Sequence, residues 1–182
     1  MSTQSPTSRR RGSSALDMAR SLAPLTVLIL VMVWLYSPSE ADPVREIDPA
    51  PTLEYAESIA DFEVLTAGDL PPGWRPTSAR VEPLTDGGPV VVTVGFVTPS
   101  QQFAEVVHGS VQEEQLLLDV LGESATETGE ISLDGGTWRD LLTADSEQAL
   151  VRSTTDSTVI VTGSAGSDEL RVLAAALRPV GG

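Results

Sequence analysis

The chain has 182 residues and contains neither cysteine nor lysine. Without cysteine it can form no disulfide, no thiolate metal site and no cysteine nucleophile. Without lysine it can form no Schiff base, and it lacks the lysine of a phosphate-binding loop. All eleven basic residues are arginines. These absences exclude several chemistries, but they do not identify a cellular compartment.

Histidine occurs once, as His108. A Ser-His-Asp arrangement would have to use His108 with Ser110 or another serine, and no stretch resembles a nucleophile elbow. A lone histidine in a strand-like stretch is more often structural, so we expect no catalytic residue. The sequence lacks the usual signatures of a metal site, since it has no histidine pair and no calcium loop motif. We therefore expect neither a metal nor a cofactor.

Aromatic residues make up 4% of the chain. The abundant acids leave two-carboxylate glycoside hydrolysis open, but a sugar cleft usually has aromatic walls, which are scarce here. Trp74 and Trp138 are the candidate surface or core-capping residues. For Trp74, which follows the turn Pro71-Pro72-Gly73, core capping is favoured over a ligand-stacking platform because large aromatic side chains usually supply burial.

Charge is distributed unevenly along the chain, whose net charge is −15. Residues 1–36 carry four arginines and one aspartate, whereas residues 37–182 carry seven arginines and 25 acids. An acidic domain with scattered arginines has no basic stripe for phosphates, so we expect no nucleic-acid partner. Docking on anionic lipid by charge is equally disfavoured.

An uncharged run of 19 residues, 21–39, lies between Arg20 and Glu40. A membrane-spanning helix needs roughly 20 mainly apolar residues, so the run predicts a single transmembrane helix in contact with the bilayer. Arginines before the run and acids after it place the N-terminus in the cytoplasm and the rest outside. The predicted topology-setting residues are Arg9, Arg10, Arg11 and Arg20. The predicted anchor residues are Leu22, Leu25, Val27, Leu28, Ile29, Leu30, Val31, Val33, Trp34, Leu35 and Tyr36.

A cleaved signal peptide is the alternative to this anchor. Ser39-Glu40-Ala41 offers small residues where a signal peptidase reads them, so the protein would be secreted after cleavage following Ala41. The long charged N-terminal region argues against this reading. Ser8–Ser13 is only a weak twin-arginine candidate, because no apolar residue follows the arginines directly.

The remaining pattern predicts one extracytoplasmic α+β domain with a mainly antiparallel sheet and two to three helices. The expected divisions are a basic tail (1–20), a transmembrane helix (21–39), a linker rich in proline and acids (40–51) and the domain (52–182). Apolar periodicity predicts helices over 52–60, 112–121 and 167–177, with Thr52 and Ser167 as N-caps. Strands are expected over 77–84, 90–97, 103–109, 130–133, 137–142, 149–153 and 158–162, with 44–47 as a further short candidate.

The loop Gly163–Leu170 carries glycines at the start of the last predicted helix. Such loops can bind anions, but Asp168 and Glu169 would repel a phosphate at once. The helix-cap interpretation is therefore favoured.

The order of these features resembles the actinobacterial "domain of unknown function 4245" family of single-pass envelope proteins. The matching stretches are "ARSLAPLTVLILVMVWL", "DPVREID", "LPPGWRPTSARV", "VGFVTPSQQFAEVVHGS", "LDGGTWRDLL" and "VIVTGSAGSDELRVLAAAL". They cover most of the chain and consist of turn and packing signatures. The resemblance implies a membrane helix with an extracytoplasmic domain, and it implies no activity or catalytic residue.

Three functions fit the sequence. A tethered, non-catalytic interaction module that meets an unknown envelope protein or wall component is favoured by the predicted anchor and by the lack of catalytic motifs. A small-ligand or lipid-binding domain is the alternative, and it requires a cavity larger than packing defects. An envelope hydrolase ranks third, since it would need His108 or a pair of acids.

Overall fold

The computed structural model describes residues 20, 22–29, 32, 45–83, 88–134 and 136–181. The chain divides into two compact units, 1–43 and 44–182. In the first unit, residues 20, 22–29 and 32 are helical. Within the described residues, no helix is both long enough and apolar enough to span a membrane. The other residues of the predicted span 21–39, the arginines Arg9 to Arg11 and the cleavage position after Ala41 lie outside the described residues.

The second unit is an α+β domain with an antiparallel sheet, as the sequence predicts. Its helices are α2 (Ala50–Ile59), α3 (Glu113–Leu121) and α4 (Ser167–Ala175). Seven strands form one sheet in the order β2-β3-β4-β8-β7-β6-β5, and every neighbouring pair is antiparallel. These strands are β2 (Arg75–Pro83), β3 (Val90–Val97), β4 (Phe103–Gly109), β5 (Thr126–Leu133), β6 (Gly136–Leu142), β7 (Gln148–Ser153) and β8 (Thr158–Thr162). A separate pair joins β1 (Leu65–Ala67) to β9 (Leu177–Pro179).

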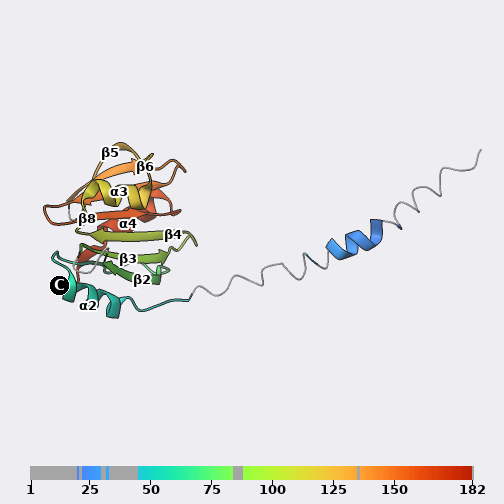
Figure 1. The fold of residues 1–182 in the computed structure, drawn as a ribbon, viewed down its shortest axis with the longest axis horizontal. Coiled ribbons are helices and arrows are strands. Elements are labelled where there is room, and N and C mark those ends of the chain that lie inside the picture. The colour runs from blue at the N-terminus through green and yellow to red at the C-terminus, as the bar shows by residue number, and fades with distance from the viewer. Residues whose placement is uncertain are drawn as a thin grey trace, which may run out of the picture. The chain divides into compact units, whose positions relative to one another are not determined.

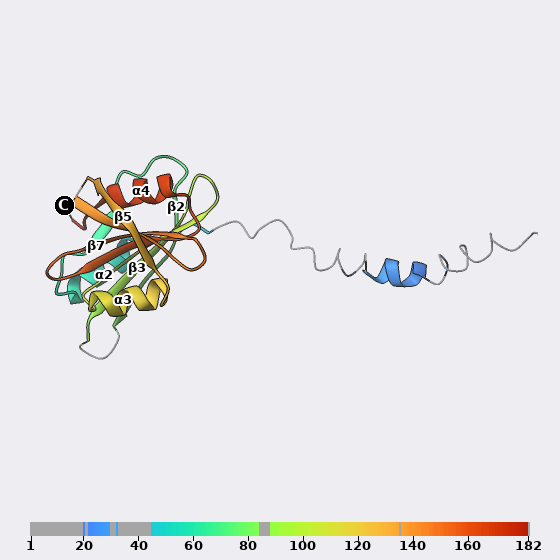
Figure 2. The same cartoon turned by 90° about the horizontal axis from the view of Figure 1, so that it is seen from above.

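Successive side chains of a strand point to opposite faces of the sheet, and helices pack on both faces. On one face, Val92, Val94 and Phe96 of β3 join Leu53 of α2 and Leu170 of α4 in the larger hydrophobic cluster. On the other face, Val107, Val151 and Ile160 pack against Leu116 and Leu121 of α3. The helices α3 and α4 consequently lie on opposite sides of the sheet (Figures 1 and 2).

Two predicted helix caps are wrong. The helix α2 begins at Ala50 instead of Thr52, because the Asp48 carboxylate accepts a hydrogen bond from the Ala50 N–H (3.0 Å) and Pro51 suits the first turn. The N-cap of α4 is Gly166, and Ser167 is already helical without a side-chain cap bond. Extended backbone at Gly166 fulfils the geometric role of an N-cap, so the helix starts one residue earlier than predicted.

The helix α4 ends at Ala175, earlier than the predicted end at Leu177, and Arg178 instead lies in β9. The Arg178 guanidinium donates to the carbonyls of Ala175 (2.7 Å) and Leu177 (2.8 Å). The Ala175 carbonyl is one that the end of a helix leaves without an intrahelical partner.

The two hairpins, β5–β6 and β7–β8, occur where the turn signals predict them. The β1–β9 pair was not predicted, since it joins three-residue strands from distant parts of the chain, with Leu65 opposite Pro179. Residues 45–49 form no strand, although the Ile47 N–H donates to the Pro76 carbonyl (2.9 Å).

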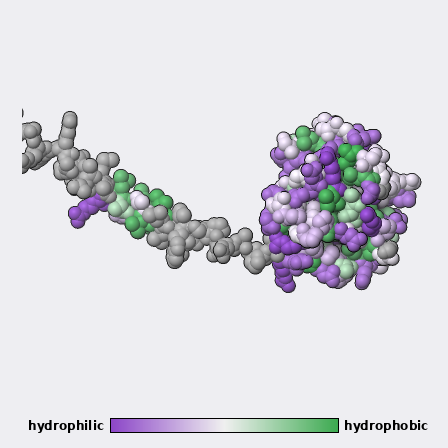
Figure 3. Space-filling view, turned by 180° about the vertical axis from the view of Figure 1, so that it is seen from behind, coloured by the Kyte–Doolittle hydropathy of each residue, from purple (hydrophilic) through white to green (hydrophobic). Residues whose placement is uncertain are grey.

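The outer surface of the domain is mixed in polarity. On the face seen in Figure 3, hydrophobic residues form small groups that are separated by hydrophilic ones. Scattered apolar residues of this kind are normal on a folded protein. The hollows of the surface, described next, are therefore more informative than its overall hydropathy.

Candidate functional site

The short helix α3 covers part of the sheet face that lies opposite α4. The nine residues of α3 span about 14 Å, whereas seven strands measure about 29 Å across. Arg139 on β6 forms ion pairs with Glu113 at the start of α3 and with Glu127 on β5 (3.6 Å). The Glu113 pair attaches the start of α3 to β6, and the β2–β3–β4 side of the sheet is only partly covered.

A groove lies on this partly covered side, between α3 and the strands β2, β3 and β4. We call it the α3 groove, and its volume is about 390 Å³. Apolar side chains from the strands and from α3 form much of its lining, among them Val91, Val107 and Val120. Its charged lining residues are Arg80, Glu82, Glu105 and Asp119. The groove thus combines an apolar floor with a mainly acidic rim.

Glu105 is the most unusual residue of the groove. It faces Gly95 on β3 and Thr162 on β8, in the middle of a strand whose other residues are mostly buried. Burial raises the pKa of its carboxyl group, and the charge of Arg80 opposes this shift. No side-chain hydrogen bond or ion pair joins the Glu105 carboxylate to another residue of the described ranges. A half-buried carboxylate without a partner costs free energy, which is typical of functional positions.

A second hollow continues the groove at the C-terminal end of α3. This α3-end hollow measures about 260 Å³ and shares Glu105 and Val120 with the α3 groove. Its other acidic lining residues are Asp145 and Glu147, and Phe103 lies at its edge with 40% of its surface exposed. Among the described residues, five carboxylates and one arginine line the two hollows together.

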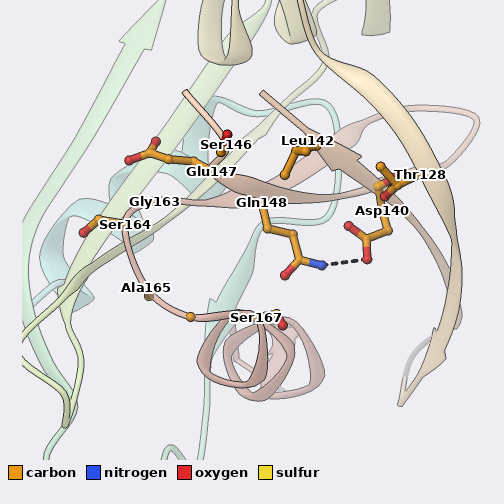
Figure 4. A pocket seen from close by; sticks show the side chains of 11 residues that line it. Thr128, Asp140, Leu142, Ser146, Glu147, Gln148, Gly163, Ser164, Ala165 and Ser167 are labelled. Carbon is orange, nitrogen blue, oxygen red and sulfur yellow. Dashed lines mark hydrogen bonds between the residues drawn. The ribbon is translucent and has the colours of Figure 1, made fainter. Parts of the chain in front are cut away.

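The volume of a third hollow, beside the start of α4, is about 560 Å³. In Figure 4, the Gln148 side chain projects into this hollow, and its amide donates to the Asp140 carboxylate (2.6 Å). The loop Gly163–Ser167 forms another wall, so the glycine loop noted in the sequence does border a hollow. However, Asp140 and Glu147 line it, and Asp168 lies in the first turn of α4. These carboxylates oppose anion binding at this helix N-terminus.

His108 is buried on the other face of the sheet. Its Nδ1 accepts the Leu65 N–H (3.3 Å), and its Nε2 lies 3.0 Å from the Ser157 Oγ. Because the Leu65 N–H can only donate, Nδ1 carries the lone pair and Nε2 carries the proton. His108 therefore donates to Ser157, which is the reverse of the arrangement in which a histidine activates a serine nucleophile.

The surroundings of His108 favour its neutral form. Burial lowers its pKa from 6.5 to about 4, and the positive charge of Arg152 acts in the same direction. The Phe62 ring packs edge-on against the imidazole, with the ring centroids 4.5 Å apart. Ser110, the serine suggested by the sequence, has a buried Oγ without a hydrogen-bond partner among the described residues. The contacts of His108 are those of a core residue that joins β4 to β1 and to the turn before β8.

The tryptophans of the second unit, Trp74 and Trp138, pack on the larger cluster. Trp138 is completely buried, and the Arg152 guanidinium lies 4.7 Å from its ring centroid. Trp74 is half-buried against the same cluster and packs edge-on against Phe96, with a centroid distance of 6.2 Å. Neither tryptophan lines the α3 groove or the α3-end hollow. For metals, no group of three His, Asp or Glu side chains in the described part of the chain is arranged to hold an ion.

Sequence reasoning missed Glu105. It is one of 26 acidic residues, and no motif distinguishes it. The available signal was its position, since "FAEVVHG" places one acid inside an otherwise apolar strand. Only the strand pairing shows that this acid faces a hollow.

Comparison with known proteins gives a family and little about activity. No curated protein matches the chain. One solved structure, described as "Crystal structure of MucB in complex with MucA(peri)", is similar with a TM-score of 0.36 and 14% sequence identity. The match covers 63% of this chain and 36% of that chain, and a likeness of this size carries no conclusion about function. A family model matches residues 10–177, so the chain belongs to the family described as "Protein of unknown function (DUF4245)".

Proposed function

We propose that this protein is a non-catalytic interaction module whose binding surface is the α3 groove together with the α3-end hollow. The observation that carries the proposal is their continuity along α3, where valines form the floor and carboxylates form the rim. Interfaces commonly combine an apolar centre with a polar edge. The partner is another protein of the cell envelope or a component of the wall.

The location of the module is part of the proposal. The charge pattern supports a single-pass anchor through residues 21–39 in the cytoplasmic membrane, with the N-terminus inside and the α+β domain outside. An acidic domain gains nothing from anionic lipid, so a covalent tether would keep it near the membrane. Cleavage after Ala41 is the competing arrangement.

The non-catalytic assignment is supported by the tautomer of His108. A general base must offer its lone pair to the nucleophile, whereas here Nε2 donates to Ser157. Arg152 and the buried position also oppose the imidazolium that a base would become.

Site-specific photocrosslinking in cells tests this function. A photoreactive amino acid replaces Val120, which both hollows share, and a control replaces the exposed Glu57 on α2. We expect the Val120 position of the full-length chain to capture a reproducible partner that the Glu57 position does not capture. Equal capture at both positions, or no capture at Val120, would contradict the proposal.

Binding of a small ligand or lipid is the second candidate, and the volume of the α3 groove favours it specifically. A hollow of about 390 Å³ with a valine floor is within the range of ligand sites, about 300–1,000 Å³. Native mass spectrometry of the full-length protein, extracted with several detergents, separates the two functions. A bound small molecule of constant mass in every extract, with no protein captured at Val120, would favour the ligand-binding function.

A further inference from the structure

The carboxylate of Glu105 occupies a position that a partner can use. It lies where the α3 groove meets the α3-end hollow, so a molecule that fills both hollows must pass it. No other residue of the described ranges satisfies it by a hydrogen bond or ion pair. Arg80, which lines the same groove, instead pairs with Glu82 (3.5 Å), and both of these side chains are more than half exposed.

We propose that Glu105 receives the guanidinium or ammonium group of an arginine or lysine side chain that an extended segment of a partner protein carries. This inference rests on the proposed function, since it names the chemistry of the segment that lies along α3. The segment presents apolar side chains to the valine floor and one cation to Glu105.

Charge decides the sign of the ligand. Glu82 and Asp119 lie on one side of Glu105 in the α3 groove, and Asp145 and Glu147 lie on the other side in the α3-end hollow. An anion would meet all five carboxylates, and a neutral ligand would leave Glu105 buried without a partner. A cation gains a charge-assisted hydrogen bond in a partly desolvated place, where such bonds are strongest.

The shape of the site favours a side chain on an extended segment over a free small cation. Apolar residues line the site on both sides of Glu105, with Val91 and Val107 in the groove and the exposed Phe103 in the end hollow. In an extended chain, alternate side chains point to the same face, so the residues two positions before and after the cation could contact these apolar surfaces while the cation reaches Glu105. A free cation would leave the apolar surfaces wet.

Peptide binding to the full-length chain in nanodiscs of zwitterionic phosphatidylcholine tests the inference. The probe is the fluorescent peptide Val-Ser-Arg-Ser-Val, whose valines and arginine share one face when it is extended, and its matched control replaces the arginine by the neutral isostere citrulline. We expect Glu105→Gln to weaken binding of the arginine peptide by about tenfold or more, as expected when a bond to a charged group is lost. Glu57→Gln removes the same charge from the opposite face of the domain and should leave binding unchanged.

The pH dependence of peptide binding provides a second readout. Binding of the arginine peptide should weaken as the pH falls through the raised pKa of Glu105, because protonation removes the charge that the cation meets. Arg80 and Glu82 on β2, Asp119 on α3, and Asp145 and Glu147 near the start of β7 also face the site, and they are present in both proteins. The part of the pH dependence that is absent from Glu105→Gln therefore belongs to Glu105.

The outcomes distinguish a failure of this inference from a failure of the proposed function on which it rests. Failure of the arginine peptide to bind the wild type, or equal binding to Glu105→Gln, would overturn the cation site. If the crosslink from Val120 then still captures a partner with equal yield in both proteins, the interaction function stands without the cation. Loss of that crosslink from the wild type itself would instead contradict the proposed function. Binding to phosphatidylethanolamine vesicles that depends on Glu105, without peptide binding, would assign the cation to a lipid headgroup and also overturn the inference.

Discussion

Replacing Trp138 by alanine should lower the free energy of unfolding by about 3–5 kcal/mol, the usual cost of truncating a large buried aromatic side chain. Trp138 has no exposed surface and belongs to the larger hydrophobic cluster. The substitution also removes the ring beneath the Arg152 guanidinium. Both the loss of apolar burial and the loss of this cation–π contact act in the same direction.

Trp74 supplies the matched control. It packs on the same cluster but is only half-buried, so Trp74→Ala should cost about 1–2 kcal/mol. Urea unfolding of the full-length wild type and both variants, followed by circular dichroism, measures the difference. Equal losses of unfolding free energy for the two substitutions would contradict the difference in burial between Trp138 and Trp74.

The second large effect is a dependence of stability on pH that comes from His108. Its pKa is lowered from 6.5 to about 4 in the folded protein, so between these values the unfolded chain binds more protons. The stability that the neutral imidazole contributes is present above the unfolded pKa and is lost as the pH falls through the folded one. The loss attributable to His108 between pH 7 and pH 4 should reach roughly 3 kcal/mol.

The variant His108→Gln isolates this contribution. It should be less stable at pH 7, because the contacts to Leu65 and Ser157 are altered, but its stability should fall less toward pH 4. Glu105 has a raised pKa and therefore changes stability in the opposite direction, equally in both proteins. Denaturant titrations across this pH range provide the measurement. Parallel pH profiles for wild type and variant would show that burial does not hold His108 neutral.

Local sequence patterns determined most of the secondary structure. Apolar residues at helical spacing indicated α3 and α4, and the Asp134-Gly135-Gly136 turn signal preceded the observed strand β6. The run Val90–Val97 was predicted to be covered on both sides, and its side chains do enter both clusters. Patterns of this kind are readable because neighbouring residues decide them. Errors concerned the ends of elements, such as the starts of α2 and β5 and the end of α4, the short strand candidate 44–47, and the pair β1–β9.

The site depended on contacts between distant parts of the chain. Pairing of β4 with β8 places Glu105 opposite Thr162, and pairing of β3 with β4 places it opposite Gly95. The position of α3 over the sheet depends on strands that lie beyond it in the chain, through its apolar packing on β7 and β8 and the ion pair between Glu113 and Arg139. A residue's neighbours across a sheet depend on strand order and register, which local periodicity does not specify.

The sequence by itself determined the composition of the domain, its α+β class and the charge pattern from which we infer its topology, because these depend on residue types and local spacing. The tertiary structure decided which acid lies unpartnered in a hollow and which nitrogen of His108 carries the proton. Both features arise where strands far apart in the sequence meet. There, burial and a few hydrogen bonds distinguish residues that look equivalent along the chain.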